Sequence, residues 1–261
     1  MAYLEVRGLQ KSYVTPRGTT DVLGGVDLAM DEGEFVAIVG YSGSGKTTLA
    51  SLIAGLIRPD AGEIVLDGAP VREPGPERGV VFQQYSLLPW MTVYENVALA
   101  VNAVHPGLDR PARRRLTEEF VALVNLTPAA WKRPRELSGG MRQRVAVARG
   151  LATNPKVLLM DEPFSALDAL TRANLQDLLL RIWGEHRATV ILITNDVDEA
   201  ILLADRIYPM TAGPAAVLGP AIEVGLQRPR VRRHLSLSPA YQKARQAIVE
   251  FLTAARPRER V

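Results

Sequence analysis

The periodicity of hydrophobic and polar positions changes twice along the chain. In the first third, residues 3–9 alternate apolar with polar, 34–40 form a short apolar run, and 62–68 end on an Asp-Gly turn. These patterns predict strands. From about residue 89 to 155, apolar residues recur three and four positions apart, which predicts helices.

Strand texture returns after the helical segment. Residues 157–160 and 189–194 are nearly continuous apolar runs, which is typical of parallel strands buried on both faces. A last helix is predicted after Ser238, which suits the N-cap position and is followed by Pro239. The apolar stripe of that helix consists of Tyr241, Ala244, Ile248 and Phe251.

Strands therefore frame a helical insertion, and the fold class is α/β. We predict a core from residues 1–88 and 156–212, a mostly α subdomain from 89–155, and a C-terminal extension, 213–261, that ends in a helix.

Composition narrows the setting. The 261 residues include no cysteine, no signal-peptide pattern and no apolar stretch long enough to cross a bilayer. We therefore expect a soluble chain whose membrane role, if it has one, comes through a partner. The net charge is +3, but residues 226–261 hold nine Lys or Arg against two acids. A solvated surface is the simplest interpretation of this basic segment, and a partner surface or an anionic headgroup layer is the alternative. It lacks the interleaved aromatics of nucleic-acid binders.

Residues 40–48 carry the strongest chemical signal. A glycine-rich loop follows one predicted strand and opens a helix, so its N–H groups and the helix N-terminus can hold phosphate. A lysine in the loop would reach the outer phosphates, and the next hydroxyl would ligate Mg²⁺. A glycine-rich turn without a ligand is the competing interpretation. The candidate phosphate-binding residues are Gly40, Ser42, Gly43, Ser44, Gly45, Lys46, Thr47 and Thr48.

Two acids end the apolar run at 157–160. Asp161 is placed to bind the Mg²⁺ shell, and Glu162 to orient or deprotonate an attacking water. Taken alone, such a pair could equally cap a helix.

A second anion cradle stands 92 residues after Lys46, where Ser138, Gly139 and Gly140 open a helix. Two chains arranged head to tail could each offer this cradle to the phosphates held by the other. With the phosphate loop, "LSGGMRQR", "LLMDEP" and "SALD" in this order, the chain resembles the ATP-binding cassette (ABC) ATPases over nearly its whole length. The resemblance implies a P-loop NTPase core, an N-terminal antiparallel β subdomain and an inserted α-helical signature subdomain.

The resemblance also implies roles for single residues. Tyr13 would stack on the adenine of ATP, although a core aromatic is an alternative. Gln83, rather than its neighbour Gln84, would ligate Mg²⁺ and sense the γ-phosphate. Asp168 would cross the interface of a dimer. The implied cofactors are ATP and Mg²⁺, the latter held by Thr47, Gln83 and Asp161.

One position departs from the family pattern. After the strand at 189–194 the family places a histidine that contacts the γ-phosphate, and this chain has Asn195. The histidines at 105, 186 and 234 lie elsewhere in the sequence. An asparagine amide can donate to a phosphate oxygen but carries no charge. Alternatively, Asn195 caps the next helix. Because Glu162 is intact, we expect hydrolysis to persist.

The segment 86–100 follows the glutamine and resembles the part of importer ATPases that contacts the membrane subunits. Its "LLPW" form is similar to importers of nitrate, sulfonate, taurine and bicarbonate, with Trp90 as an interface anchor or, alternatively, a core aromatic. The resemblance implies an ATP-driven clamp of two ATPase subunits at the cytoplasmic face of a bacterial inner membrane. Its partners would be permease subunits near Gln83–Trp90 and, indirectly, a periplasmic or lipid-anchored binding protein. The transported solute is not encoded in this chain.

Three other functions were weighed. An ABC ATPase of DNA repair would interrupt the cassette with coiled coils or zinc modules, and no heptads or cysteines occur here. A regulatory subunit that binds ATP without efficient hydrolysis is motivated by Asn195. An exporter ATPase would share every core motif.

Overall fold

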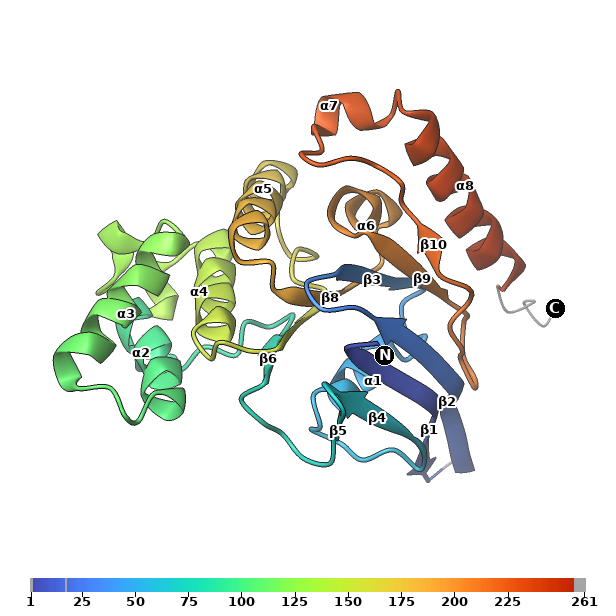
Figure 1. Ribbon diagram of the computed structural model, residues 1–261, viewed down its shortest axis with the longest axis horizontal. Helices are drawn as coiled ribbons and strands as arrows, with labels where there is room; N and C mark the ends of the chain where they lie inside the picture. The colour runs from blue at the N-terminus through green and yellow to red at the C-terminus, as the bar shows by residue number, and fades with distance from the viewer. Residues whose placement is uncertain (1, 17, 256–261) are drawn as a thin grey trace. The chain divides into compact units, whose positions relative to one another are not determined.

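A computed structural model describes residues 2–16 and 18–255 (Figure 1). The chain forms two compact units, residues 1–74 with 189–261 and residues 75–188, and each is considered by itself. The domain boundaries predicted from the sequence, at 88/89 and 155/156, differ from the boundaries of these two units, and they remain a prediction.

The first unit begins with an antiparallel sheet of order β2-β1-β4-β5. Alternate residues of β1 and β2 pack inward, and Leu4 pairs with Met30 and Val6 with Leu28 in the register of the hairpin. The strands alternate because only one of their faces is buried. Their bounds are β1 Leu4–Thr15, β2 Gly18–Met30, β4 Ala61–Leu66 and β5 Ala69–Pro70.

The same unit contains a parallel sheet in which β3 (Phe35–Gly40) lies between β8 (Thr189–Thr194) and β9 (Arg206–Met210). Every residue of β3 and β8 is buried, which for β8 was predicted from its continuous apolar run. The short strand β10 (Ile222–Glu223) joins β9 in antiparallel register.

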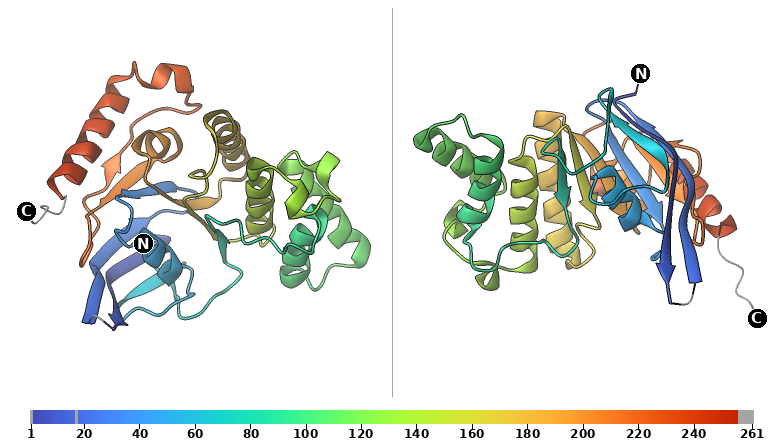
Figure 2. Two further views of the ribbon diagram at one scale, coloured as in Figure 1. Left: turned by 180° about the vertical axis from the view of Figure 1, so that it is seen from behind. Right: turned by 90° about the horizontal axis from the view of Figure 1, so that it is seen from below.

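Helices cover both faces of this sheet. Figures 1 and 2 show α6 and α8 on one face and α1 on the other. The helix α8 begins after Ser238 as predicted, although Ser238 makes no side-chain capping bond. The bounds are α1 Lys46–Ile53, α6 Val197–Leu203, α7 Arg232–Leu235 and α8 Pro239–Ala254.

The second unit packs helices beside a parallel strand pair, β6 (Arg78–Val81) and β7 (Val157–Asp161). Local signals explain where its helices begin: Thr92 and Glu95 form a capping box, and Asp109, Ser138 and Asp168 cap the next three helices. The helices are α2 Val93–Val104, α3 Arg110–Leu123, α4 Gly139–Leu151 and α5 Ala169–His186, with 3₁₀ turns η1 Thr127–Ala129 and η2 Pro134–Glu136.

Within residues 2–16 and 18–255, no helix combines the length and the apolarity needed to span a bilayer.

Candidate functional site

The loop between β3 and α1 has the geometry of a phosphate cradle. Gly43 and Gly45 have φ values of 78° and 96°, a left-handed conformation that residues with a Cβ rarely adopt. A Cβ on Gly45 would also lie 2.8 Å from Cγ1 of Val22. Lys46 is only 4% exposed, and its Nζ donates to the carbonyl oxygens of Gly40 (3.0 Å) and Tyr41 (2.7 Å). The loop carbonyl oxygens therefore hold the ammonium group of Lys46 close to the loop backbone.

Two hydroxyls at this loop suit a phosphate ligand. Ser44 Oγ is buried and has no hydrogen-bond partner among the described residues, and a buried unsatisfied hydroxyl is costly. Thr47, in the first turn of α1, is exposed, whereas Thr48 and Tyr41 are half-buried and Ser42 is exposed. The loop thus offers an orphaned polar group and an accessible hydroxyl.

Asn195 lies at the same sheet edge as this loop. In the parallel register Val39 pairs with Thr194, so the chain leaves β8 at Asn195 where β3 gives way to the cradle. The helix that follows is capped by Asp196, whose Oδ1 accepts from the N–H groups of Asp198 (2.9 Å) and Glu199 (3.0 Å). The interpretation of Asn195 as the helix cap is therefore wrong.

Tyr13 belongs to β1 in the same unit. Its side chain is 41% exposed, so the alternative of a core aromatic does not hold. Lys11 Nζ lies 5.7 Å from the centre of its ring, which leaves a flat, accessible surface next to a positive charge.

In the second unit, the ends of β6 and β7 bring Gln83 and Glu162 together. Gln83 Nε2 donates to Glu162 Oε2 (3.5 Å) and to Ser165 Oγ (3.2 Å). Glu162 has a φ of 44°, an unusual conformation for a residue with a side chain. Asp161, the last residue of β7, is buried. The next helix is capped by Asp168, so neither acid of this pair is a helix cap.

Ser138, Gly139 and Gly140 open α4 as predicted. Ser138 is exposed at the N-terminus of the helix, and its Oγ accepts from Met141 N–H (3.3 Å). A Cβ on Gly140 would lie 2.3 Å from Thr171 Cγ2 of α5, so a larger residue there requires the Thr171 side chain or a helix to shift. Asp168 is exposed, and hydrogen bonds from Thr171 lower the pKa of its carboxyl group.

Arg149, which the sequence analysis missed, supports the turn after Gln83. Tyr85 and Ser86 in that turn have positive φ values. From α4, Arg149 donates to the carbonyl oxygens of Tyr85 (3.1 Å) and Ser86 (2.5 Å). Burial lowers the pKa of its guanidinium group. No local motif announces this contact, because it joins positions more than 60 residues apart.

Trp90 is 65% exposed, so the alternative of a core aromatic is wrong for it. The turn that presents it is held by Asn96, which is fully buried and was also missed. Asn96 Oδ1 accepts from Leu88 N–H, and its Nδ2 donates to the carbonyl oxygens of Leu88, Met91 and Thr92.

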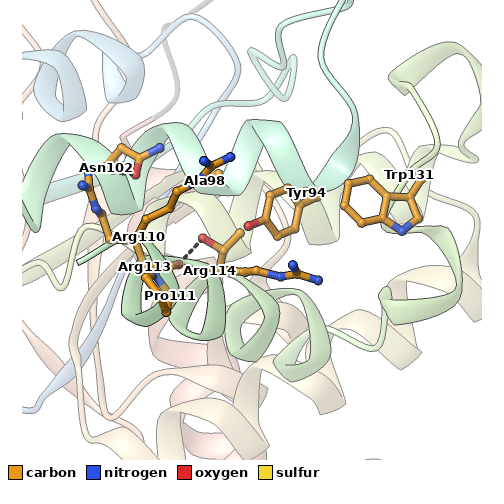
Figure 3. Close-up of a pocket in the computed structure, with 9 residues that line it drawn as sticks. Tyr94, Ala98, Asn102, Arg110, Pro111, Arg113, Arg114 and Trp131 are labelled. Atoms are coloured by element: carbon orange, nitrogen blue, oxygen red, sulfur yellow. Dashed lines mark hydrogen bonds between the residues drawn. The ribbon is translucent and has the colours of Figure 1, made fainter. Parts of the chain in front are cut away.

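A pocket of about 780 Å³ lies beside this turn, between α2 and α3 (Figure 3). The rings of Tyr94 and Trp131 stack along one wall, with their centroids 5.1 Å apart. The lining contains no acidic side chain and consists of Tyr94, Ala98, Asn102, Arg110, Pro111, Arg113, Arg114, Thr117 and Trp131.

Across the described part of the chain, no group of three or more His, Cys, Asp or Glu side chains is placed to hold a metal. The predicted ligands Thr47, Gln83 and Asp161 bring a single carboxylate. That donor set is typical of Mg²⁺ bound together with nucleotide phosphates and water.

Comparisons with known proteins all match this chain to ATP-binding proteins of the ABC transporter family. Residues 23–165 match the ABC transporter family. The chain is 48% identical over 250 residues to the bicarbonate transport ATP-binding protein CmpD of Synechococcus elongatus, which covers 96% of this chain and 90% of that protein. It is 49% identical over 242 residues to the nitrate import ATP-binding protein NrtD of the same organism, which covers 93% and 88%. Among solved structures, the dimeric ATP-binding cassette MJ0796 in a post-hydrolysis state with ADP and Pi has a TM-score of 0.75 and 32% identity, covering 84% of this chain and 98% of that one.

Proposed function

The chain belongs to the ABC transporter family of ATP-binding proteins, and we propose that it drives the import of a small anion of the nitrate, bicarbonate, sulfonate or taurine type. It binds ATP and couples its hydrolysis to transport, as members of this family do. The observation that carries the proposed solute class is the similarity, over nearly the whole chain, to bicarbonate and nitrate import subunits.

The phosphate cradle supports the proposed nucleotide site. Lys46 would transfer its hydrogen bonds from loop carbonyls to phosphate oxygens, and the loop N–H groups would surround the β-phosphate. Ser44 would gain the partner that it lacks in the described structure. Tyr13 would stack on the adenine.

For the chemical step, Glu162 would orient or deprotonate the attacking water. Its hydrogen bond with Gln83 supports a role for that glutamine in sensing the γ-phosphate. Bound Mg²⁺, ligated by Thr47, Gln83 and Asp161, would supply charge neutralisation at the outer phosphates.

A dimer would complete the site. The solved relative MJ0796 is dimeric with ADP and Pi. Here Ser138, Gly139 and Gly140 would contact the nucleotide held by a second cassette, and Asp168 would cross the interface. Closure on two ATP molecules would do the mechanical work, and hydrolysis would reopen the clamp.

Permease subunits would dock on the surface around Trp90. That side chain is exposed on a turn fixed by a buried asparagine, and exposed aromatics held rigidly are typical interface anchors. The pocket between α2 and α3 is lined by Arg110, Arg113 and Arg114, and of these Arg114 pairs with Glu118 on the same helix. The excess of arginines suits a partner segment that brings carboxylates. A binding protein would act through the permease, at the cytoplasmic face of an inner membrane.

The experiment that tests this function is steady-state phosphate release by the purified chain with Mg-ATP, beside Asn195→His and Glu162→Gln. We expect turnover by the natural chain and by Asn195→His, and a loss of at least about a hundredfold with Glu162→Gln. A natural chain without activity that Asn195→His makes active would instead identify a regulatory subunit with a degenerate site, the alternative function motivated by Asn195.

A further inference from the structure

The basic C-terminal segment is not simply a solvated surface. Arg230 is almost fully buried, and its Nη1 donates to the carbonyl oxygens of Ile201 (2.9 Å) and Ala204 (2.6 Å) at the end of α6. Arg228 donates to the carbonyl oxygen of Leu203 (2.6 Å). The last carbonyls of a helix lack partners within it and carry partial negative charge. For these two arginines, the expectation of a solvated face is therefore wrong.

Arg230 keeps its charge in this position. Burial, and secondarily Arg228, lower its pKa to about 10, so the guanidinium group remains protonated at neutral pH. Residues 256–261, which hold three more of the predicted basic charges, lie outside the described residues.

The other end of α6 is held by α8. Tyr241 Oη donates to Asp198 Oδ1 (2.7 Å), and Arg245 Nε donates to the same oxygen (3.0 Å). Ala244 and Ile248, on the same stripe of α8, are buried. Asp198 lies in the first turn of α6, three residues after Asn195. The segment 228–245 thus contacts both ends of α6. Arg228 and Arg230 bind its C-terminal carbonyl oxygens, and Tyr241 and Arg245 bind Asp198 in its first turn.

These contacts with α6 affect the position of Asn195, which lies just before the helix. The helix α6 has only seven residues, and so short a helix is not stable without tertiary contacts. Asn195 directly follows β8, and only Asp196 separates it from the first residue of α6. A neutral amide acts on a phosphate only through a hydrogen bond of good geometry, whereas a charged imidazolium would also act at longer range. An asparagine at this position therefore needs a more firmly fixed backbone.

We infer that Tyr241 and Arg245 are positioning residues for ATP hydrolysis, which hold Asp198 and thereby the start of α6 so that Asn195 faces the γ-phosphate. The inference rests on the proposed function. Neither residue touches nucleotide; both act through Asp198.

The test compares Arg245→Gln with Lys243→Gln, which removes the same charge from the same helix at an exposed position. Tyr241→Phe, Arg245→Lys and Asp198→Asn complete the set. Three quantities are measured on the full chain: amide hydrogen exchange over residues 194–199, and kcat and KM for Mg-ATP. Loss of the contact with Asp198 should raise the rate of exchange in Arg245→Gln and lower its kcat. Because an exposed ion pair contributes little free energy, both changes should be only about twofold to fivefold.

Four further results are expected. KM should stay constant, Arg245→Lys should recover most of the loss, and Arg245→Gln should have no added effect in the Asp198→Asn background. Tyr241→Phe should resemble Arg245→Gln in direction.

The inference is overturned if Arg245→Gln matches Lys243→Gln in exchange, or if exchange rises while kcat does not fall. A natural chain without ATPase activity would instead remove the proposed function. The exchange comparison would then decide by itself whether α8 holds the start of α6.

Discussion

Glycine is favoured at position 140 by the space available rather than by backbone conformation. The nearest atom to an added Cβ is Thr171 Cγ2, at 2.3 Å, whereas a Cβ on Gly139 would meet its neighbours at an ordinary 3.5 Å. The first turn of α4 therefore packs directly against that of α5. A signature that is recognised in sequence as a phosphate motif is also a close helix contact.

We predict that Gly140→Ala lowers the free energy of unfolding by about 1–3 kcal/mol, because the extra methyl group overpacks the contact between helices. Urea denaturation measures it, with Gly139→Ala as the control that should change stability less. Thr171→Ser removes the opposing methyl group and should restore most of the loss in the double variant. Equal losses for both glycine variants would contradict the packing argument.

At the level of elements, two turns in the second unit depend on side chains from neighbouring helices. Asn96 of α2 fixes the turn that presents Trp90, and Arg149 of α4 fixes the turn at Tyr85 and Ser86. Both turns are irregular, so their backbone groups find partners outside regular ladders.

Asn96→Ala should lower the free energy of unfolding by about 2 kcal/mol or more, because Leu88 N–H loses its acceptor, the carbonyl oxygen of Met91 loses its donor, and the carbonyl oxygens of Leu88 and Thr92 each lose one of two hydrogen bonds. Thermal or urea unfolding measures the change. Asn102→Ala on the same helix, whose amide makes one weak contact of 3.4 Å, is the matched control and should cost much less. A stability loss no greater than that of the control would show that water replaces the asparagine.

Trp90→Ala should leave ATP binding unchanged and weaken association with the permease by tenfold or more, as truncation of an aromatic anchor does. Co-purification or a binding titration with permease in detergent measures it. Leu56→Ala is the control, since Leu56 is exposed on the other unit. Unchanged permease affinity would remove Trp90 from the docking surface.

For the whole molecule, the elements with chemical or periodic signals were predictable. Continuous apolar runs correctly marked β7 and β8 as buried parallel strands, and α8 starts where Ser238 and Pro239 predicted. The phosphate cradle could be inferred because glycine spacing fixes local backbone geometry. Contacts such as Arg149 with Tyr85, or Arg230 with α6, were not predictable, because an arginine far along the chain carries no local sign of its partner. Asn195 was misjudged as a possible cap because Asp196, beside it, is an equally good capping residue.

Glu162→Gln should trap an ATP-bound dimer, since the proposed clamp would close on ATP and open only after hydrolysis. Light scattering with saturating Mg-ATP should show a doubling of the 28.5 kDa mass, and the natural chain should revert as ATP is consumed. A variant that stays monomeric under these conditions would contradict the clamp for the isolated subunit.

The contact of Arg149 makes α4 a rigid connection between two parts of the second unit. The helix begins at Ser138, the residue proposed to meet the other cassette's nucleotide, and at its far end Arg149 grips the turn that follows Gln83. Its 13 residues make a stiff rod about 20 Å long. A tilt imposed at one tip is therefore delivered to the other with little loss. If Ser138 contacts the opposite chain's nucleotide as proposed, α4 would transmit the occupancy of that nucleotide to the turn at Tyr85 and Ser86, even when the subunit's own nucleotide has not moved.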